Sequence, residues 1–179
     1  MIERYPGVAH YGRLDHTTSG EYSGSVRSLT GINLLKGDWQ DTLLDLTSES
    51  VQSLTLVVPF IKEDTFTRVL GAKASGVELQ LLSRFSVPQF YRGASDISVF
   101  RHALSINAVV KTAQRLHAKV YLFDRKHAIV TSSNLTNAGV HSNLEYGVLL
   151  SDEETVEKVA ADCEDFFAAK DVGVVDMEI

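Results

Sequence analysis

Two short stretches of the chain carry polar side chains at spacings that suit phosphate chemistry. His117 and Lys119 are two residues apart, and so are Ser132 and Asn134. Side chains two apart in a strand point to the same face, so each pair acts together if it lies in a strand. If the two strands pair, all four side chains converge on one small region. Histidine can attack phosphorus or donate a proton, lysine can neutralise phosphate oxygens, and serine and asparagine can hold those oxygens.

The elements that must position these residues alternate along the chain. Helical spacing predicts helices over residues 38–50, 63–74, 96–107 and 152–170, and apolar or alternating runs predict strands over 54–60, 77–82, 108–111, 116–123, 128–131 and 144–150. Residues 83–96 read as a loop with one helical turn. The strand–helix–strand rhythm predicts an α/β fold with a mixed, largely parallel sheet and helices on both faces. We expect one domain over residues 1–179, in which residues 1–36 form an irregular segment with short strands at most.

Charge is unevenly spread over the 179 residues, whose net charge is −6. Residues 84–127 contain eight Lys or Arg and two Asp, a local charge of +6 around the motif. This excess suits phosphate binding, and a solvated face is the other interpretation. The single cysteine excludes an intrachain disulfide and fits a reducing compartment. The sequence shows no signal peptide and no apolar stretch long enough for a bilayer, so we expect a cytoplasmic protein without a membrane partner.

The sequence resembles the phospholipase D superfamily, whose signature is HxKxxxxD followed by GSxN. Residues 117–124 read HAKVYLFD and residues 131–134 read TSSN. Thr131 stands where the family has a glycine, which can let the backbone approach a phosphate closely. The family also has a downstream glutamate that bonds to the nucleophilic histidine, and Glu145 is the matching residue. The resemblance covers about residues 115–150 closely and implies a phospholipase D-like α/β/α sandwich.

The resemblance also implies a metal-independent phosphodiesterase that needs no cofactor. His117 would attack the phosphodiester and form a phosphohistidine, a second histidine would protonate the leaving oxygen, and water would release the phosphate. Lys119, Ser132 and Asn134 would bind the phosphate, and Glu145 would support the histidine. The chain has one His-x-Lys motif where a complete site needs two. We therefore expect a homodimer whose twofold axis passes through the site.

Several residues have a second interpretation. Asp124 lies in the turn that closes the motif, where binding of backbone N–H groups is favoured over catalysis. Ser132 and Asn134 can form a turn cap instead of a phosphate site. Arg84 follows a strand at its carboxyl end, where α/β sheets bind ligands, so it and Thr131 are candidate substrate contacts. Three further histidines are expected to have no part in the chemistry: His102, His127 and His141.

We favour a DNA endonuclease or a restriction-type nuclease domain, because the motif is single and the surrounding window is basic. The sequence contains no zinc-finger or helix-turn-helix pattern, so recognition of a DNA sequence would require a separate domain or subunit. A phospholipase D-like lipid phosphodiesterase is one alternative, although such relatives usually carry two motifs in one chain. A catalytically inactive nucleic-acid-binding module is another, and Thr131 keeps it open.

Overall fold

The computed structural model describes residues 31–176, and residues 1–30 and 177–179 lie outside the described part. In chain order the elements are β1 (Ile32–Lys36), α1 (Gln40–Glu49), β2 (Ser53–Val57), α2 (Glu63–Ala72), β3 (Glu78–Ser83), α3 (Val87–Tyr91), α4 (Ile97–Ser105), β4 (Val109–Thr112), β5 (Val120–Phe123), β6 (His127–Thr131), the π-helix η1 (Ala138–Ser142), β7 (Tyr146–Leu150), α5 (Glu153–Ala168) and β8 (Gly173–Val174).

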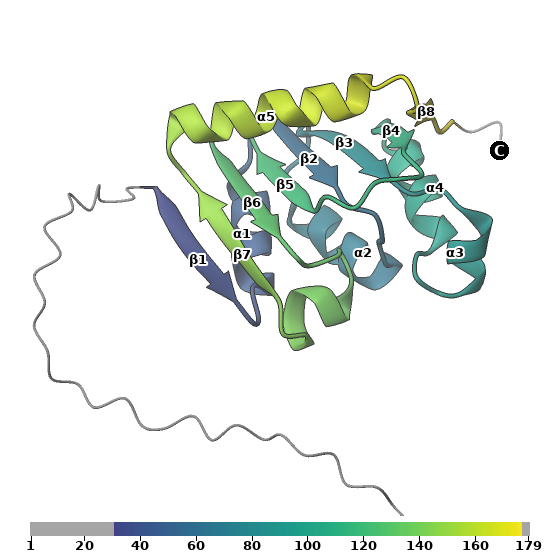
Figure 1. The fold of residues 1–179 in the computed structure, drawn as a ribbon, viewed down its shortest axis with the longest axis horizontal. Coiled ribbons are helices and arrows are strands. Elements are labelled where there is room, and N and C mark those ends of the chain that lie inside the picture. Colours follow the sequence, from purple (N-terminus) through teal and green to yellow (C-terminus); the bar gives the residue numbers. More distant parts are fainter. Residues whose placement is uncertain (1–30, 177–179) are drawn as a thin grey trace, which may run out of the picture.

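The described strands form one sheet in the order β1-β7-β6-β5-β2-β3-β4-β8. Figure 1 shows α5 crossing one face of this sheet, with α1 and α2 behind the other face. Apolar residues of α1, α2 and α4 share a single core cluster with that second face. The prediction of an α/β fold with a mixed sheet and helices on both faces is confirmed.

The prediction that the sheet is largely parallel is wrong. Parallel pairing is confined to β2–β3 and β3–β4, whereas β1–β7, β2–β5, β4–β8, β5–β6 and β6–β7 are antiparallel. The length of the connections explains the difference. Helices cross over between the parallel strands, but a tight turn joins β5 to β6, and a tight turn imposes antiparallel pairing. Asp124 and Arg125 both have positive φ in that turn, as a type I′ hairpin requires.

The sheet centre is buried on both faces, which fixes how the helices pack. Leu43 of α1, Phe66 of α2 and Phe100 of α4 lie in one core with Tyr121 of β5. On the opposite face α5 buries Cys163 against the sheet. All four residues of β5 are buried, as expected for a strand covered on both sides. The strand inside the HAKVYLFD motif is therefore held in the middle of the molecule.

Some boundaries differ from the sequence prediction. Residues 1–36 were predicted as an irregular segment with short strands at most, and residues 32–36 form the short edge strand β1, which pairs with β7. The part of that prediction on residues 1–30 lies outside the described residues. The strand predicted over 116–123 begins only at Val120. The short elements η1 and β8 were not predicted, and α3 supplies the helical turn expected between 83 and 96. Within residues 31–176, no helix combines the length and the apolar character needed to cross a membrane.

Candidate active site

The HAKVYLFD motif begins at one end of the central strands of the sheet. At this end β2, β3 and β6 finish and β5 starts. His117 and Lys119 precede β5 instead of lying in it, yet they meet. The Nζ atom of Lys119 lies 3.4 Å from Nδ1 and 3.5 Å from Nε2 of His117, and it donates to the His117 carbonyl oxygen at 2.9 Å. The His117 side chain is exposed, whereas Lys119 is only 8% exposed. An accessible imidazole thus stands beside a nearly buried ammonium group.

The surroundings of Lys119 disfavour its charge. Burial lowers the pKa of the Lys119 ammonium below its ordinary value, the positive charge of Arg84 lowers this pKa further, and the carboxylate of Glu145 raises it. A buried cation that is not fully compensated is costly, because it has lost much of its hydration. An anion bound next to Lys119 would supply the missing compensation, which makes this position suited to a phosphate.

Ser132 and Glu145 form a pair at the ends of β6 and β7. The Ser132 hydroxyl donates to the Glu145 carboxylate and accepts from the backbone N–H of Tyr146 at 3.1 Å. The other Glu145 oxygen accepts from Asn143 Nδ2 at 3.1 Å. The resemblance implied that the Glu145 carboxylate accepts a hydrogen bond from His117, but among the described residues it accepts from Ser132 and Asn143. Glu145 therefore orients Ser132 and acts on Lys119 through its charge.

Two polar groups at the same edge are buried without partners. The Oδ1 atom of Asn134 and the Nε atom of Arg84 make no hydrogen bond within the described residues. The Arg84 guanidinium lies over the Phe60 ring, 5.5 Å from its centroid. Buried polar groups in native proteins normally have a partner, and exceptions concentrate at functional sites. The unpaired Arg84 Nε is a donor and suits an anionic ligand, whereas the unpaired Asn134 Oδ1 is an acceptor and suits a ligand group that donates.

Thr131, the residue in place of the family's glycine, is matched by a glycine across the sheet. Thr131 pairs with Gly147 of β7, and a Cβ atom on Gly147 would lie 2.7 Å from the Thr131 Cβ. The Thr131 hydroxyl donates to the Tyr146 carbonyl and accepts from the Ser133 N–H, both at 3.2 Å. Space for the threonine thus comes from the partner strand, and its hydroxyl braces the turn that carries Ser132. A glycine inside the predicted strand 144–150 was the sequence signal for this close approach.

A network that sequence reasoning missed anchors the loop after β6. Gly139 in η1 packs so closely that a Cβ there would lie 2.4 Å from the Asn134 carbonyl oxygen. Trp39 Nε1 donates to the Gly139 carbonyl at 3.2 Å, and the buried Tyr121 hydroxyl donates to the Ser133 carbonyl at 3.1 Å. These contacts tie the Ser132–Asn134 turn to the core. The glycine in the run TNAGVH was the one available signal, and it says nothing about its distant partners.

Asp124 lies at the opposite end of β5, away from the other motif residues. Its carboxylate accepts three backbone hydrogen bonds, from the N–H groups of Val51, Gln52 and Ser53, at 2.8 to 2.9 Å. Burial alone would raise the pKa of Asp124, but these donors outweigh burial, and the pKa lies below its ordinary value. The carboxylate thus joins the β5–β6 turn to the start of β2.

The other histidines within the described residues each have a different partner. The Nδ1 atoms of these histidines face the following oxygens: Glu63 Oε1 at 3.3 Å from His102, Ser151 Oγ at 3.0 Å from His127, and Asp38 Oδ2 at 2.5 Å from His141. Residues 31–176 contain no group of three or more His, Cys, Asp or Glu side chains that could hold a metal ion. The chemistry available at this edge is therefore that of one accessible imidazole surrounded by cationic and neutral donors.

The structure was compared with known proteins. Nuc from Salmonella typhimurium, described as a phospholipase D family member, superposes with a TM-score of 0.67 at 16% identity, over 81% of this chain and 99% of that one. NucT from Helicobacter pylori gives a TM-score of 0.62 at 16% identity, over 82% and 98% of the two chains. The archaeal chromatin protein TrmBL2, reported to show a novel mode of DNA binding, gives 0.57 at 12% identity, over 79% of this chain and 54% of that one. At such low identities these likenesses show a shared fold.

No curated protein sequence matches the chain. A family model does match it: the model described as "Cardiolipin synthase, PLD-like domain" aligns with residues 43–167. That stretch is well over half of the chain and contains every candidate site residue described above. The protein therefore belongs to the phospholipase D-like domain family, within the phospholipase D superfamily of phosphodiesterases.

Proposed function

We propose that this protein is a metal-independent phosphodiesterase that cleaves DNA, with His117 as its nucleophile. The observation that carries the proposal is the accessible His117 imidazole beside the buried Lys119 ammonium, 3.4 to 3.5 Å away. Lys119 favours a bound phosphate because an anion would compensate its charge. Such fixed positive groups are most effective where charge develops in a transition state.

The proposed cleavage of the phosphodiester has two steps. In the first, a His117 ring nitrogen attacks phosphorus and forms an N–P bond while the P–O bond to the leaving group breaks, and a second imidazole gives its proton to the leaving oxygen. In the second, that imidazole takes a proton from water, the water oxygen attacks phosphorus, and the N–P bond breaks. Lys119 neutralises the non-bridging oxygens, with the Asn134 side-chain NH2 group as a neutral donor and Arg84 as an additional cation. Ser132 can donate to the phosphate only when its hydroxyl releases the Glu145 carboxylate.

A second copy of the chain supplies the second imidazole in this proposal. The remaining histidines of residues 31–176 contact other partners, so His117 of another copy is the natural candidate. In a dimer with twofold symmetry each His117 faces its equivalent across the axis. Leu144 and Tyr146, on either side of Glu145, are exposed apolar side chains against which that copy can pack.

DNA is favoured as substrate because the window 84–127 is basic around the motif. The chain shares its fold with the phospholipase D family member Nuc and with NucT. A lipid phosphodiester is the second candidate, because the matching family model is described by cardiolipin synthase. Binding of DNA without cleavage, as suggested by the likeness to TrmBL2, is the third.

Cleavage assays separate these candidates. Wild type and His117→Ala are incubated in EDTA with plasmid DNA, bis(p-nitrophenyl) phosphate and phosphatidylglycerol vesicles. We expect wild type to cleave the DNA and the chromogenic diester, with the variant at least about 10³-fold slower, because the nucleophile is lost. Loss of wild-type activity in EDTA would refute the metal-independent mechanism. Hydrolysis confined to the lipid would establish the second candidate, and DNA binding without hydrolysis the third.

Subunit mixing tests the shared site. Wild type and His117→Ala are denatured together, refolded in varied ratios and assayed at constant total protein. If each site needs both copies of His117, an equal mixture retains about one quarter of full activity, because only dimers of two wild-type chains work. Retention of about half, as independent sites give, would contradict a shared site.

A further inference from the structure

The segment between β3 and α4, residues 84–96, begins at the candidate site with Arg84, but its other residues have no role in the reaction proposed above. Its first part contacts the loop that carries His117: Gln114 Nε2 donates to the Phe85 carbonyl at 2.9 Å, and the Phe85 N–H donates to Thr112 Oγ1 at 2.8 Å. The segment begins with Arg84, whose charge acts on Lys119. Figure 1 shows α3 projecting at the same edge of the molecule as η1.

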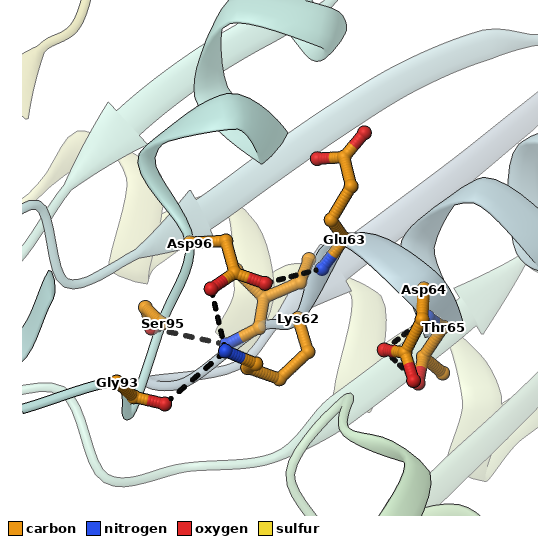
Figure 2. Close-up of polar contacts among 8 residues, drawn as sticks. Lys62, Glu63, Asp64, Thr65, Gly93, Ser95 and Asp96 are labelled. Carbon is orange, nitrogen blue, oxygen red and sulfur yellow. Dashed lines mark hydrogen bonds and ion pairs between the residues drawn. The ribbon is translucent and has the colours of Figure 1, made fainter.

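A set of polar contacts fixes the far end of the segment, as Figure 2 shows. Lys62 Nζ bonds to Asp96 Oδ1 at 2.5 Å and to the Gly93 carbonyl at 3.3 Å. The Ile61 N–H donates to Ser95 Oγ at 3.1 Å. Ile61 also pairs with Leu135, which directly follows the Ser132–Asn134 turn. The segment is therefore joined to both halves of the candidate site.

Aromatic packing fixes the inner side of α3 and leaves the outer side bare. Phe85, Phe90 and Phe100 contact one another edge to face, with ring centroids 5.0 to 5.6 Å apart. In contrast, Tyr91 is 92% exposed, and Arg92 is exposed beside it. Neither side chain makes a hydrogen bond or ion pair within the described residues. The outer side of α3 thus presents an aromatic ring and a cation to solvent.

The charge of this surface points to an anionic polymer. Residues 84–95 contain two arginines and no acidic residue. The next acidic residue along the sequence is Asp96. Its carboxylate already bonds to Lys62 and accepts from the Glu63 N–H at 2.9 Å. An aromatic ring next to an arginine is the combination with which proteins stack unpaired bases and hold the adjoining phosphate. Lipid is disfavoured because α3 has five residues, too few for the apolar face with which interfacial helices enter a membrane.

We propose that α3 binds a single-stranded stretch of DNA next to the scissile phosphate, with Tyr91 stacking on a base and Arg92 holding a phosphate. This inference rests on the proposed nuclease function and adds a strand-binding surface to it. The active site would then prefer substrates that are unpaired on the α3 side. The two residues contact the polymer and not the reacting atoms.

Binding measured in a His117→Ala background keeps the test independent of cleavage. Fluorescence anisotropy with labelled oligo(dT) is compared for this parent and for added Tyr91→Ala or Arg92→Ala. We expect Tyr91→Ala to weaken binding about tenfold, as the loss of one stacked base does, and Tyr91→Phe to restore it. Arg92→Ala should reduce the slope of log K against log salt by about 0.7, the value for one phosphate contact on a single strand. Lys126→Ala, which removes an exposed cation from the opposite edge of the sheet, is the matched control and should leave the affinity unchanged.

The outcomes separate this inference from the proposed function. Wild-type cleavage together with unchanged oligo(dT) affinity in both α3 variants would overturn the inference and leave the nuclease standing. Weakened binding in those variants, from a protein that cleaves no DNA, would support the surface and reject the nuclease. Dissociation of a dimer by Tyr91→Ala, or binding of phosphatidylglycerol vesicles that this variant abolishes, would overturn the inference in favour of a protein or lipid contact.

Discussion

The two ends of β5 carry the two buried charges of the same motif, and they are treated in opposite ways. At the turn end, the Asp124 carboxylate accepts three backbone hydrogen bonds and its pKa is lowered. At the other end, the pKa of Lys119 is also lowered, but here the shift means that its charge is disfavoured. Nearby Asn134 and Arg84 each leave one buried polar atom unpaired. One end is complete without a ligand and the other is not.

The same eight-residue motif thus contains a residue with a structural role, Asp124, and a residue suited to binding a ligand, Lys119. A buried polar group stabilises the fold when its hydrogen bonds are made, as those of Asp124 are. A site that binds an anion keeps positive charge and donors unsatisfied until the ligand arrives, and Lys119 carries such a charge. Motif membership alone therefore does not assign a role. The partners of each side chain do.

After the loss of His117, the largest expected effect comes from Lys119→Met, which removes the charge while keeping most of the side-chain volume. We expect kcat/KM for a phosphodiester to fall about 10²–10³-fold, the usual loss for one group that stabilises transition-state charge. The free energy of unfolding should stay equal or rise, because a desolvated charge is gone. Activity is measured with bis(p-nitrophenyl) phosphate and stability by urea unfolding. Full activity in a folded Lys119→Met would place the phosphate elsewhere.

Asp124→Ala should have the reverse profile. Removing the carboxylate leaves three backbone N–H groups without their acceptor, so we expect a loss of roughly 2–4 kcal/mol in the free energy of unfolding. Activity per folded molecule should be retained at temperatures where the variant remains folded. Urea unfolding with a matched activity assay reports both quantities. A stable variant that had lost its activity would return Asp124 to the catalytic group.

The stabilising role of Asp124 should also depend on pH. Because the pKa of Asp124 is lower in the folded protein than in the unfolded chain, its contribution is present above the unfolded pKa, about 3.9. It is lost as pH falls through the folded pKa. The difference in thermal unfolding temperature between wild type and Asp124→Ala should therefore be constant near neutrality and shrink as the pH falls below the unfolded pKa of the carboxyl group. A difference that grew on acidification would contradict this assignment of the lowered pKa.

A smaller effect is expected where Thr131 faces Gly147. A methyl group on Gly147 would lie 2.7 Å from the Thr131 Cβ and 2.8 Å from the Val130 carbonyl oxygen, so Gly147→Ala should cost about 1–3 kcal/mol. The same methyl group would also lie 2.8 Å from Thr131 Oγ1, so adding Thr131→Gly removes two of the three close contacts and should recover part of that loss, as a double-mutant cycle measures. Strictly additive losses would show that the two residues do not share this space.

The sequence was sufficient for local structure and for the motif, and insufficient for long-range partners. Hydrophobic spacing predicted α1, α2, α4 and α5 within a few residues, because each buries one apolar stripe. Antiparallel pairing around β5 was missed because the type I′ turn lacks the usual glycine and has Asp124 and Arg125 at positive φ. The bond of Ser132 to Glu145 and the unpaired Arg84 Nε depend on the packing of distant segments, which spacing along the chain does not encode.

Direct detection of a covalent adduct on His117 tests the central claim most simply. Wild type is mixed with a DNA phosphodiester substrate in EDTA, quenched in base, in which phosphohistidine survives, and analysed by mass spectrometry of its peptides. We expect the peptide that contains His117 to gain the mass of the substrate minus its leaving alcohol, and His117→Ala to gain none. Turnover without an adduct on His117, or an adduct on another residue, would contradict the account.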